Sequence, residues 1–228
     1  TKRNQKTQIY LPASAKHENI FSLFLAMTKD LINARELIWR LFLRDFKAKY
    51  KQSLLGWAWV FLLPLLAVGT FFLLNKSGAI KIENIPVPYP IYGLIGISLW
   101  QIFSGGLSLT TGSIVSAGSF VTKINFSREA LVVSSIGQVI VEFLIRILLL
   151  LLIYPIYGLF PTAWIFILPF LMIPLILFTL GLGFITSLLH ALVRDVQSFI
   201  NIAMGFFLFL MPIMYTAPKS GFLQQINR

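Results

Sequence analysis

Two charged residues, Glu142 and Arg146, are the sharpest chemical signal in the sequence because they stand inside a long apolar stretch. They are four positions apart, so on an α-helix they share a face and can form an ion pair. An isolated charge in the middle of a bilayer costs roughly 2.5–3.5 kcal/mol, so we expect both side chains to face a bundle interior or water. We interpret them as an intramembrane ion pair, inside the bundle or at a dimer contact. The alternative is that they line a polar path.

Other residue types that carry out catalysis or bind metals are scarce or widely spaced. The chain has no cysteine, and its two histidines, His17 and His190, are far apart. The phosphate-binding pattern G-x-x-x-x-G-K-[ST] does not occur, so the sequence predicts no nucleotide hydrolysis in this chain. Glu142 and Arg146 have no further carboxylate at similar depth with which to build a proton relay. We therefore expect no catalytic residues, no metal site and no cofactor in this chain.

A basic stripe follows one face of a helix predicted over residues 31–51, which contain no Pro or Gly. At ~100° per residue, Arg40, Arg44 and Lys47 share that face and aromatic residues lie beside it, while Lys49 interrupts the back. Such a helix is typical of the membrane interface plane, with cations among phosphates and aromatics at the acyl boundary. It either only anchors the protein or, as a sharper hypothesis, lines an entry portal for a lipid headgroup.

The elements that must position these residues are membrane helices. Hydrophobic residues make up 57% of the 228 residues and charged residues only 12%, whereas a soluble domain has about 25% charged residues. The uncharged run over 52–75 is 24 residues long, and about 20 helical residues cross a hydrocarbon layer. The net charge of +11 is concentrated beside the apolar runs, which favours anionic lipid headgroups over nucleic acid as its partner. The sequence predicts an all-α integral membrane bundle.

Proline and glycine divide the apolar runs into spans. Pro64 predicts a kink in the first span, and Pro155, Gly158 and Pro161 separate the third span from the fourth. A cytoplasmic N-terminal segment over 1–30 and the interfacial helix over 31–51 precede a transmembrane domain over 52–218. Within that domain we expect spans near 54–74, 91–111, 131–154, 163–189 and 198–215, with a polar turn over 112–130.

The basic residues are divided unequally between the two sides that these spans define. One side carries eleven Lys or Arg within 1–51 together with Lys123, Arg128 and Arg194, and the other side carries four. This positive-inside bias places the N-terminus in the cytoplasm. Five crossings then leave residues 219–228 as the start of an outward-facing segment.

Four sequence blocks, in this order along the chain, resemble the permease subunits of type-2 ABC exporters for polysaccharides. They are RDFKAKYKQSLLGWAWVFLLPLL (44–66), YPIYGLIGISLWQIFSGGLS (89–108), VTKINFSREAL (121–131) and HALVRDVQ (190–197). Two positions, Leu99 and Ser127, differ from the family pattern, which often has proline there. The similarity extends over most of 31–218, and members of the family have six spans, so the last span is expected to be missing from this sequence.

The resemblance implies a function and partners for the chain. It implies the type-2 exporter permease fold and a homodimer that exports a lipid-linked polysaccharide, such as O-antigen, capsule or teichoic acid, across the bacterial inner membrane. Two copies of a cytoplasmic P-loop ATPase subunit would carry ATP and Mg²⁺. A coupling helix would contact that ATPase, and it corresponds here to Thr122, Lys123, Ile124, Asn125, Phe126, Ser127, Arg128 and Glu129.

Aromatic side chains are the candidates for a glycan channel, because sugars stack on aromatic rings. On the three spans that resemble the channel-forming ones, the candidates are Trp57, Trp59, Trp100, Phe103, Phe206, Phe207 and Phe209. Lipid-facing or core packing is the default for each of them. With an exporter in view, Glu142 and Arg146 are alternatively the lining of a glycan or pyrophosphate path. Two rival functions stay open: a type-2 exporter of another lipid or drug, and a membrane-embedded lipid-modifying enzyme.

Overall fold

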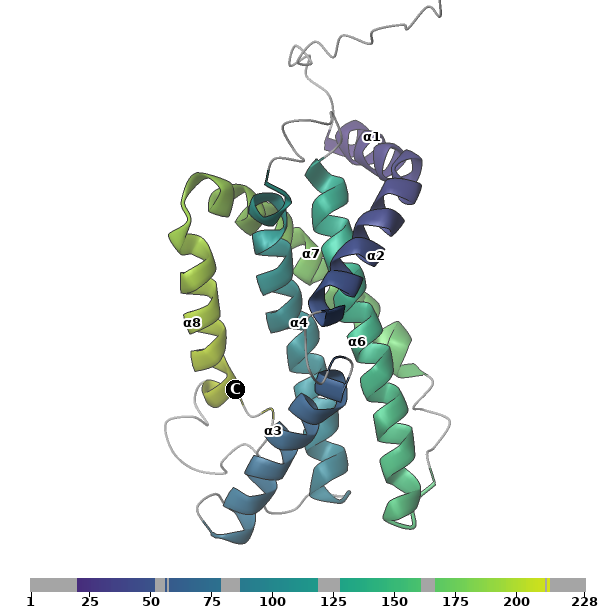
Figure 1. The fold of residues 1–228 in the computed structure, drawn as a ribbon, viewed down its shortest axis with the longest axis vertical. Coiled ribbons are helices and arrows are strands. Elements are labelled where there is room, and N and C mark those ends of the chain that lie inside the picture. The colour runs from purple at the N-terminus through teal and green to yellow at the C-terminus, as the bar shows by residue number, and fades with distance from the viewer. Residues whose placement is uncertain are drawn as a thin grey trace, which may run out of the picture.

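Seven helices make up the described part of the chain, and no strand occurs in it (Figure 1). The computed structural model describes residues 20–51, 56, 58–78, 87–118, 128–160, 167–211 and 213. The helices are α1 (Ile20–Asn33), α2 (Arg35–Lys51), α3 (Ala58–Lys76), α4 (Tyr89–Ala117), α6 (Arg128–Ile156), α7 (Leu168–Leu192) and α8 (Asp195–Leu210). The predicted all-α class is confirmed.

Helix α4 is the centre of the bundle, where it contacts α3, α6, α7 and α8 (Figure 1). Its contact with α7 uses small residues spaced four apart on both helices, Gly106 and Thr110 on α4 and Thr179 and Gly183 on α7. Small residues at this spacing let membrane helices approach closely and gain van der Waals contact. A hydrogen bond of 2.8 Å between the hydroxyls of Thr111 and Thr186 adds to this contact.

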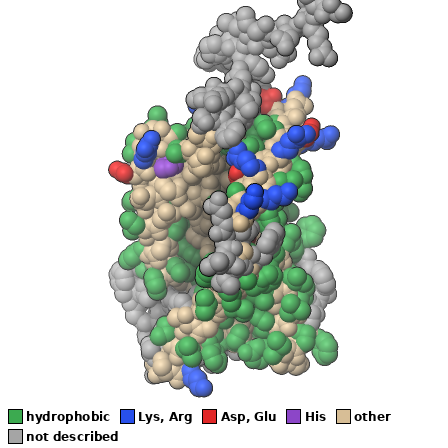
Figure 2. Space-filling model, in the orientation of Figure 1, with side chains coloured by type: hydrophobic (Ala, Val, Ile, Leu, Met, Phe, Trp, Pro, Cys, Tyr) green, Lys and Arg blue, Asp and Glu red, His purple; other side chains and the backbone are tan. Residues whose placement is uncertain are grey.

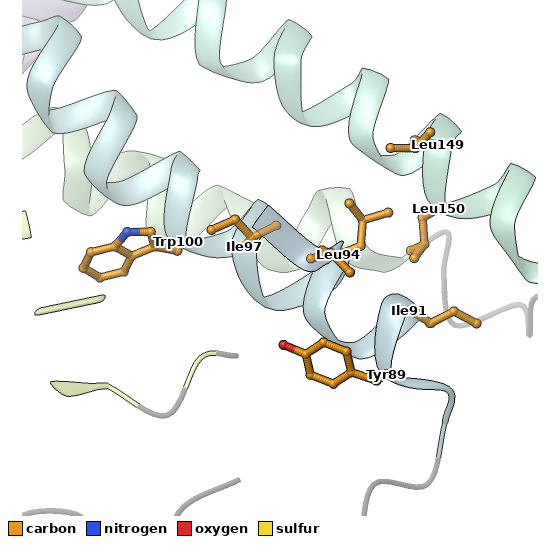
Figure 3. Close-up of a cluster of buried hydrophobic side chains, with 8 residues drawn as sticks. Tyr89, Ile91, Leu94, Ile97, Trp100, Leu149 and Leu150 are labelled. Atoms are coloured by element: carbon orange, nitrogen blue, oxygen red, sulfur yellow. The ribbon is translucent and has the colours of Figure 1, made fainter. Parts of the chain in front are cut away.

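The largest apolar cluster lies between α4 and α6, toward the end of α4 at which that helix begins. Figure 3 shows Ile91 and Leu94 of α4 beside Leu149 and Leu150 of α6, with Trp100 further along α4. Ile91 and Leu94 have almost no exposed surface. This cluster fixes the two central helices against each other and so fixes the polar residues one to three turns away.

Three helices, α4, α6 and α7, are long and apolar enough to cross a membrane, and shorter apolar helices run over Ala58–Leu74 and Asp195–Leu210. Their bounds differ from the expected spans most clearly at the end of α4. Residues 112–117, expected in a turn, continue the helix, and the Ser113 and Ser116 hydroxyls donate to carbonyls one turn back, at 2.7 and 2.6 Å. Helix α4 ends at Ala117, and the next residue, Gly118, has a φ of 49° that is readily adopted only by glycine.

The N-terminal helices also differ from expectation. A helix was expected from residue 31, but α1 begins at Ile20, and the chain bends at Ala34 before α2. Ala34 still donates to Asp30 O and accepts from Ile38 N, both at 2.9 Å, so the bend keeps the helical hydrogen bonds. Residues 1–19 and 212–228, apart from Ile213, lie outside the described residues, as do the expectations made for them.

Helix α2 packs along α6 rather than across the helix ends. Near the start of α6, Leu41 packs with Leu131, and further along α6 the Phe42 ring contacts Gly137. At the end of α2, Lys49 reaches Glu142, which is near the middle of α6. Placement in the membrane interface plane stays a prediction for α2. Its apolar face is buried against a neighbouring helix, and its C-terminal end lies level with the centre of α6.

Basic side chains are distributed unequally along the long axis of the bundle. Figure 2 shows basic side chains gathered at the end of the molecule where α1 and α2 lie, above a belt of hydrophobic side chains. Helix α3 ends at the opposite end, with exposed Lys76 in its last turn. The molecule thus has one strongly basic end and a long apolar surface.

Candidate functional site

A cavity of about 440 Å³ lies between α2, α3, α4 and α6 and contains the charged residues singled out by the sequence. Its walls are mostly apolar, but five polar or charged side chains lie among them. The lining residues are Lys49, Trp59, Val60, Leu63, Pro64, Ala67, Ile97, Gln101, Gly105, Ser108, Leu109, Val139, Glu142 and Arg146. Mostly apolar walls with a few polar groups are typical of ligand sites.

Three charges form a connected group in this cavity, which we call the charge triad: Lys49, Glu142 and Arg146. Lys49 Nζ lies 2.5 Å from Glu142 Oε1, and Arg146 Nη2 lies 3.3 Å from Glu142 Oε2. The side chain of Arg146 is 7% exposed, that of Glu142 16% and that of Lys49 41%. Because each oxygen of the carboxylate faces a different cation, Glu142 offsets part of the desolvation cost of both.

Sequence reasoning missed Lys49, although a signal for it was present. Lys49 follows Phe42 by seven positions and Phe46 by three, so it lies on the same helix face as these two rings. Both rings are buried. A cation on this face lies within reach of the neighbouring helix, and its partner there is Glu142. Lys49 lies on the side of α2 away from the basic stripe, as the sequence predicts, and that side faces α6.

Gly137 of α6 makes the approach of α2 possible. A Cβ atom at Gly137 would lie 2.9 Å from Cδ2 of Phe42, a distance that real Cβ atoms essentially never show. The absence of that atom allows the Phe42 ring to sit directly on the α6 backbone. This contact brings the last turn of α2 to Glu142.

Helices α3 and α4 supply the other walls. Helix α3 presents Trp59, Val60, Leu63 and the buried Pro64, which lies inside the helix as the sequence predicts. Helix α4 presents the amide of Gln101 and the hydroxyl of Ser108. The cavity is therefore apolar on its α3 side and polar toward α4 and α6.

A hydrogen-bonded group connects the cavity with α8. Ser108 Oγ donates to Asn201 Oδ1 at 2.9 Å and accepts from Gln197 Nε2 at 2.8 Å. Sequence reasoning did not single out any of these three residues, because no pattern connects positions about 90 apart. They fix α8 to the polar side of α4.

A second cavity, of about 230 Å³, adjoins the first, and Leu109 lines both. Polar side chains dominate its walls: Arg44 and Asp45 of α2, Ser113 and Ser116 of α4, and Ser135 and Gln138 of α6. Because α2 runs along α6, the second cavity lies nearer the basic end of the molecule than the first. The polar side chains of the two cavities form a row from that end to the charge triad, which we call the polar zone.

The three predicted portal residues are placed differently from one another. Arg44 lines the second cavity, where its Nε lies 2.7 Å from Asp45 Oδ1. Arg40 is exposed and pairs with Glu36 on its own helix at 2.6 Å. Lys47 is exposed on α2. All three residues lie on the helix predicted for them, and of the three Arg44 lines a cavity.

The candidate channel aromatics do not gather at one site. Trp59 lines the first cavity, whereas Trp100 and Phe103 line an apolar cavity of about 620 Å³ between α4 and α7. There the rings of Phe103 and Phe178 stack with centroids 5.9 Å apart. Phe206, Phe207 and Phe209 are exposed on α8. Trp57 lies outside the described residues.

The predicted coupling segment is described only at its end. Thr122, Lys123, Ile124, Asn125, Phe126 and Ser127 lie outside the described residues. Arg128 and Glu129 form the first turn of α6, where the carboxylate of Glu129 interacts favourably with the positive end of the helix dipole.

Long apolar helices around a partly polar, charged cavity indicate a helical membrane protein. Residues 36–228 match the model of the ABC-2 type transporter family, and the chain belongs to that family. The resemblance inferred from the sequence blocks is thereby confirmed.

Three curated relatives share the same name. The chain is 27% identical, over 191 residues, to "O-antigen export system permease protein RfbA" of Myxococcus xanthus, covering 84% of this chain and 72% of that protein. It is 26% identical, over 176 residues, to two proteins of the same name from Klebsiella pneumoniae, covering 76% of this chain and 66% of each of them. The chain thus spans about two thirds of the length of the Klebsiella relatives.

Proposed function

We propose that this chain is the membrane-spanning subunit of an ATP-driven exporter that moves a lipid-linked polysaccharide of the O-antigen type outward across the bacterial inner membrane. The observation that carries this proposal is the 26–27% identity to O-antigen export permeases over most of the chain. The cavity between α2, α3, α4 and α6 is consistent with it, since an amphiphilic cargo needs polar and apolar walls side by side.

The basic end of the molecule faces the cytoplasm in this proposal. The exposed Lys and Arg side chains of α1 and α2 gather there. Arg194, which is exposed between α7 and α8, is expected on the same side of the membrane. Positive residues near span ends are retained on the cytoplasmic side during insertion. The N-terminus is then cytoplasmic, and the end of α3 at Lys76 faces outward.

The energy for export comes from a separate subunit. Two copies of a cytoplasmic P-loop ATPase, with ATP and Mg²⁺, bind a homodimer of this chain, and the chain itself carries no catalytic residues. The segment 122–129 is the contact that couples the two subunits. Because its last residues, Arg128 and Glu129, open the 29-residue helix α6, movement of the segment is passed directly to the wall that carries Glu142.

The entry path begins at the exposed face of α2 and continues along the polar zone. Arg40, Arg44 and Lys47 attract the anionic headgroup of the cargo, and Trp59 offers a ring surface inside the first cavity. Charge-assisted hydrogen bonds between arginine and phosphate oxygens are among the strongest polar contacts available. The cargo moves from the basic end toward the centre of α6.

Deletion of the gene in its native host tests the proposal. We expect loss of surface polysaccharide and accumulation of the completed, lipid-linked glycan inside the cell, with recovery from a plasmid copy. Pull-down of the tagged chain should recover a P-loop ATPase. Unchanged surface polysaccharide in the deletion strain would contradict the proposal, as would turnover of a substrate by the purified chain without nucleotide.

Replacement of Arg40, Arg44 and Lys47 together by Gln tests the entry path. We expect export to be abolished while assembly with the ATPase is kept. The matched control is Lys29→Gln, which removes an exposed cation from α1. Export that persists in the triple variant would refute the portal but not the transport function.

A further inference from the structure

The charge triad has the composition of an anion-binding site that is occupied by a carboxylate of the protein itself. Two cations, Lys49 and Arg146, converge on one carboxylate, Glu142, so the group carries a net charge of +1 inside an otherwise uncharged cavity wall. The cavity, at about 440 Å³, is within the 300–1,000 Å³ range of small-ligand sites. A site of this size and charge favours an anion.

The two oxygens of Glu142 show where the oxygens of an incoming anion would lie. Oε1 faces Lys49 Nζ and Oε2 faces Arg146 Nη2. A phosphate group also presents several oxygens to convergent cations, and the guanidinium fork suits it. The cations are therefore already directed at positions that phosphate oxygens can occupy.

The unequal burial of the two cations is suited to exchange. Arg146 is almost fully buried and fixed on α6, whereas the Lys49 side chain is 41% exposed on a flexible stem. Lys49 can leave Glu142 and follow an incoming anion, because its ammonium group is the most exposed of the three charges. Gln101 and Ser108 offer uncharged polar groups on the α4 wall.

We propose that Lys49 and Arg146 form a binding site for the phosphate or diphosphate group of an amphiphilic ligand, and that Glu142 is the resident counter-ion which this group displaces. The inference deepens the proposed function and rests on it for the source of the ligand, a lipid-linked phosphate. The apolar α3 wall, with Val60, Leu63 and Pro64, contacts the lipid portion, and the second cavity with Arg44 is the approach.

Binding of defined probes tests this site. The full-length permease, purified in detergent with its ATPase partner, is titrated by calorimetry with farnesyl diphosphate, with farnesol and with inorganic pyrophosphate. We expect farnesyl diphosphate to bind at least tenfold more tightly than either of the other probes. Equal binding of farnesol would overturn the anion site, and equal binding of pyrophosphate would overturn the assignment to a lipid-linked ligand.

Two variants separate ligand binding from a purely structural role. Lys49→Gln should weaken farnesyl diphosphate binding about tenfold, which corresponds to about 1.4 kcal/mol. Glu142→Gln should tighten it about tenfold, because the competing charge is removed while the side-chain shape is kept. A structural ion pair predicts the opposite for Glu142→Gln. Wild-type affinity in Lys49→Gln, or unchanged or weaker affinity in Glu142→Gln, would overturn the proposal.

A control variant and a measurement of polysaccharide export complete the test. Lys76→Gln removes a cation at the far end of α3 and should leave the affinity unchanged. If Glu142→Gln does not fold, Lys49→Gln decides alone, because Arg146 still pairs with Glu142 in that variant. Normal polysaccharide export in cells together with a failed binding test would reject this site and leave the transport function standing.

Discussion

Gly183 of α7 lies so close to Thr110 of α4 that a Cβ atom at Gly183 would be 2.6 Å from Cβ of Thr110. Thr110 has no exposed surface, and its hydroxyl donates to Gly106 O at 2.8 Å, so its side chain has little freedom to move away. The contact between the two helices therefore depends on the absence of one methyl group.

Gly183→Ala should lower the thermal stability of the purified permease. Overpacking a tight contact typically costs about 1–3 kcal/mol, which exceeds the gain of roughly 1 kcal/mol in helix propensity on replacing glycine by alanine. The matched control is Gly181→Ala on the same helix, where no atom lies within 4 Å of the new Cβ. Thermal unfolding in detergent measures both, and equal melting temperatures for the two variants would contradict this packing.

The aromatic residues of α2 should differ sharply in their importance. Phe42→Ala removes a buried ring that lies against Gly137, and we expect a cost of about 3 kcal/mol from lost burial and the cavity left behind. Trp39→Ala removes a larger but exposed ring from the same helix and should cost about 0.5 kcal/mol or less. Chemical denaturation in detergent compares the two. A larger loss for Trp39→Ala would contradict the packing of Phe42 against Gly137.

The hydrogen bonds between α4 and α8 should contribute modestly to stability. Gln197→Ala removes the donor to Ser108 and should cost about 1 kcal/mol, within the range measured for polar contacts between membrane helices. Ser198→Ala changes an exposed neighbouring position and is the control. The difference in melting temperature between the two variants is the measurement, and no difference would show that this group does not fix α8.

The chain has no cysteine, so single cysteines can report its orientation without background labelling. Lys47→Cys, on exposed α2, should react with a membrane-impermeant maleimide in inside-out vesicles. Lys76→Cys, at the opposite end of the bundle, should react in right-side-out vesicles. The reverse pattern would place the N-terminus outside the cell.

Much of the fold was predictable because it follows from local patterns. The lengths of the apolar runs predict the membrane helices, and the four-residue spacing of Glu142 and Arg146 is enough to bring them within 3.3 Å of each other on one helix. The end of α4 was not predictable in the same way. Ser113 and Ser116 can favour either a turn or a helix, and the hydroxyl bonds that they make to carbonyls one turn back are compatible with the helix.

The rest of the site depends on contacts between distant positions. Lys49 and Glu142 are 93 positions apart, as are Ser108 and Asn201, and no helical periodicity connects such pairs. The same limit applies to the aromatic residues. The faces of Trp59 and Trp100 are set by which helices pack beside them, so the sequence alone does not show that they line different cavities.

The hydrogen bond between Lys49 and Glu142 depends on the angle between α2 and α6. Glu142 lies 14 residues before the end of α6 at Ile156, a distance of roughly 21 Å at ~1.5 Å per residue. A rotation of α6 by about 10° around that end would move the Glu142 carboxylate by roughly 4 Å, which is more than the length of a hydrogen bond. A tilt of α6 by this amount, with α2 held still, would therefore separate the Glu142 carboxylate from the present position of the Lys49 ammonium group.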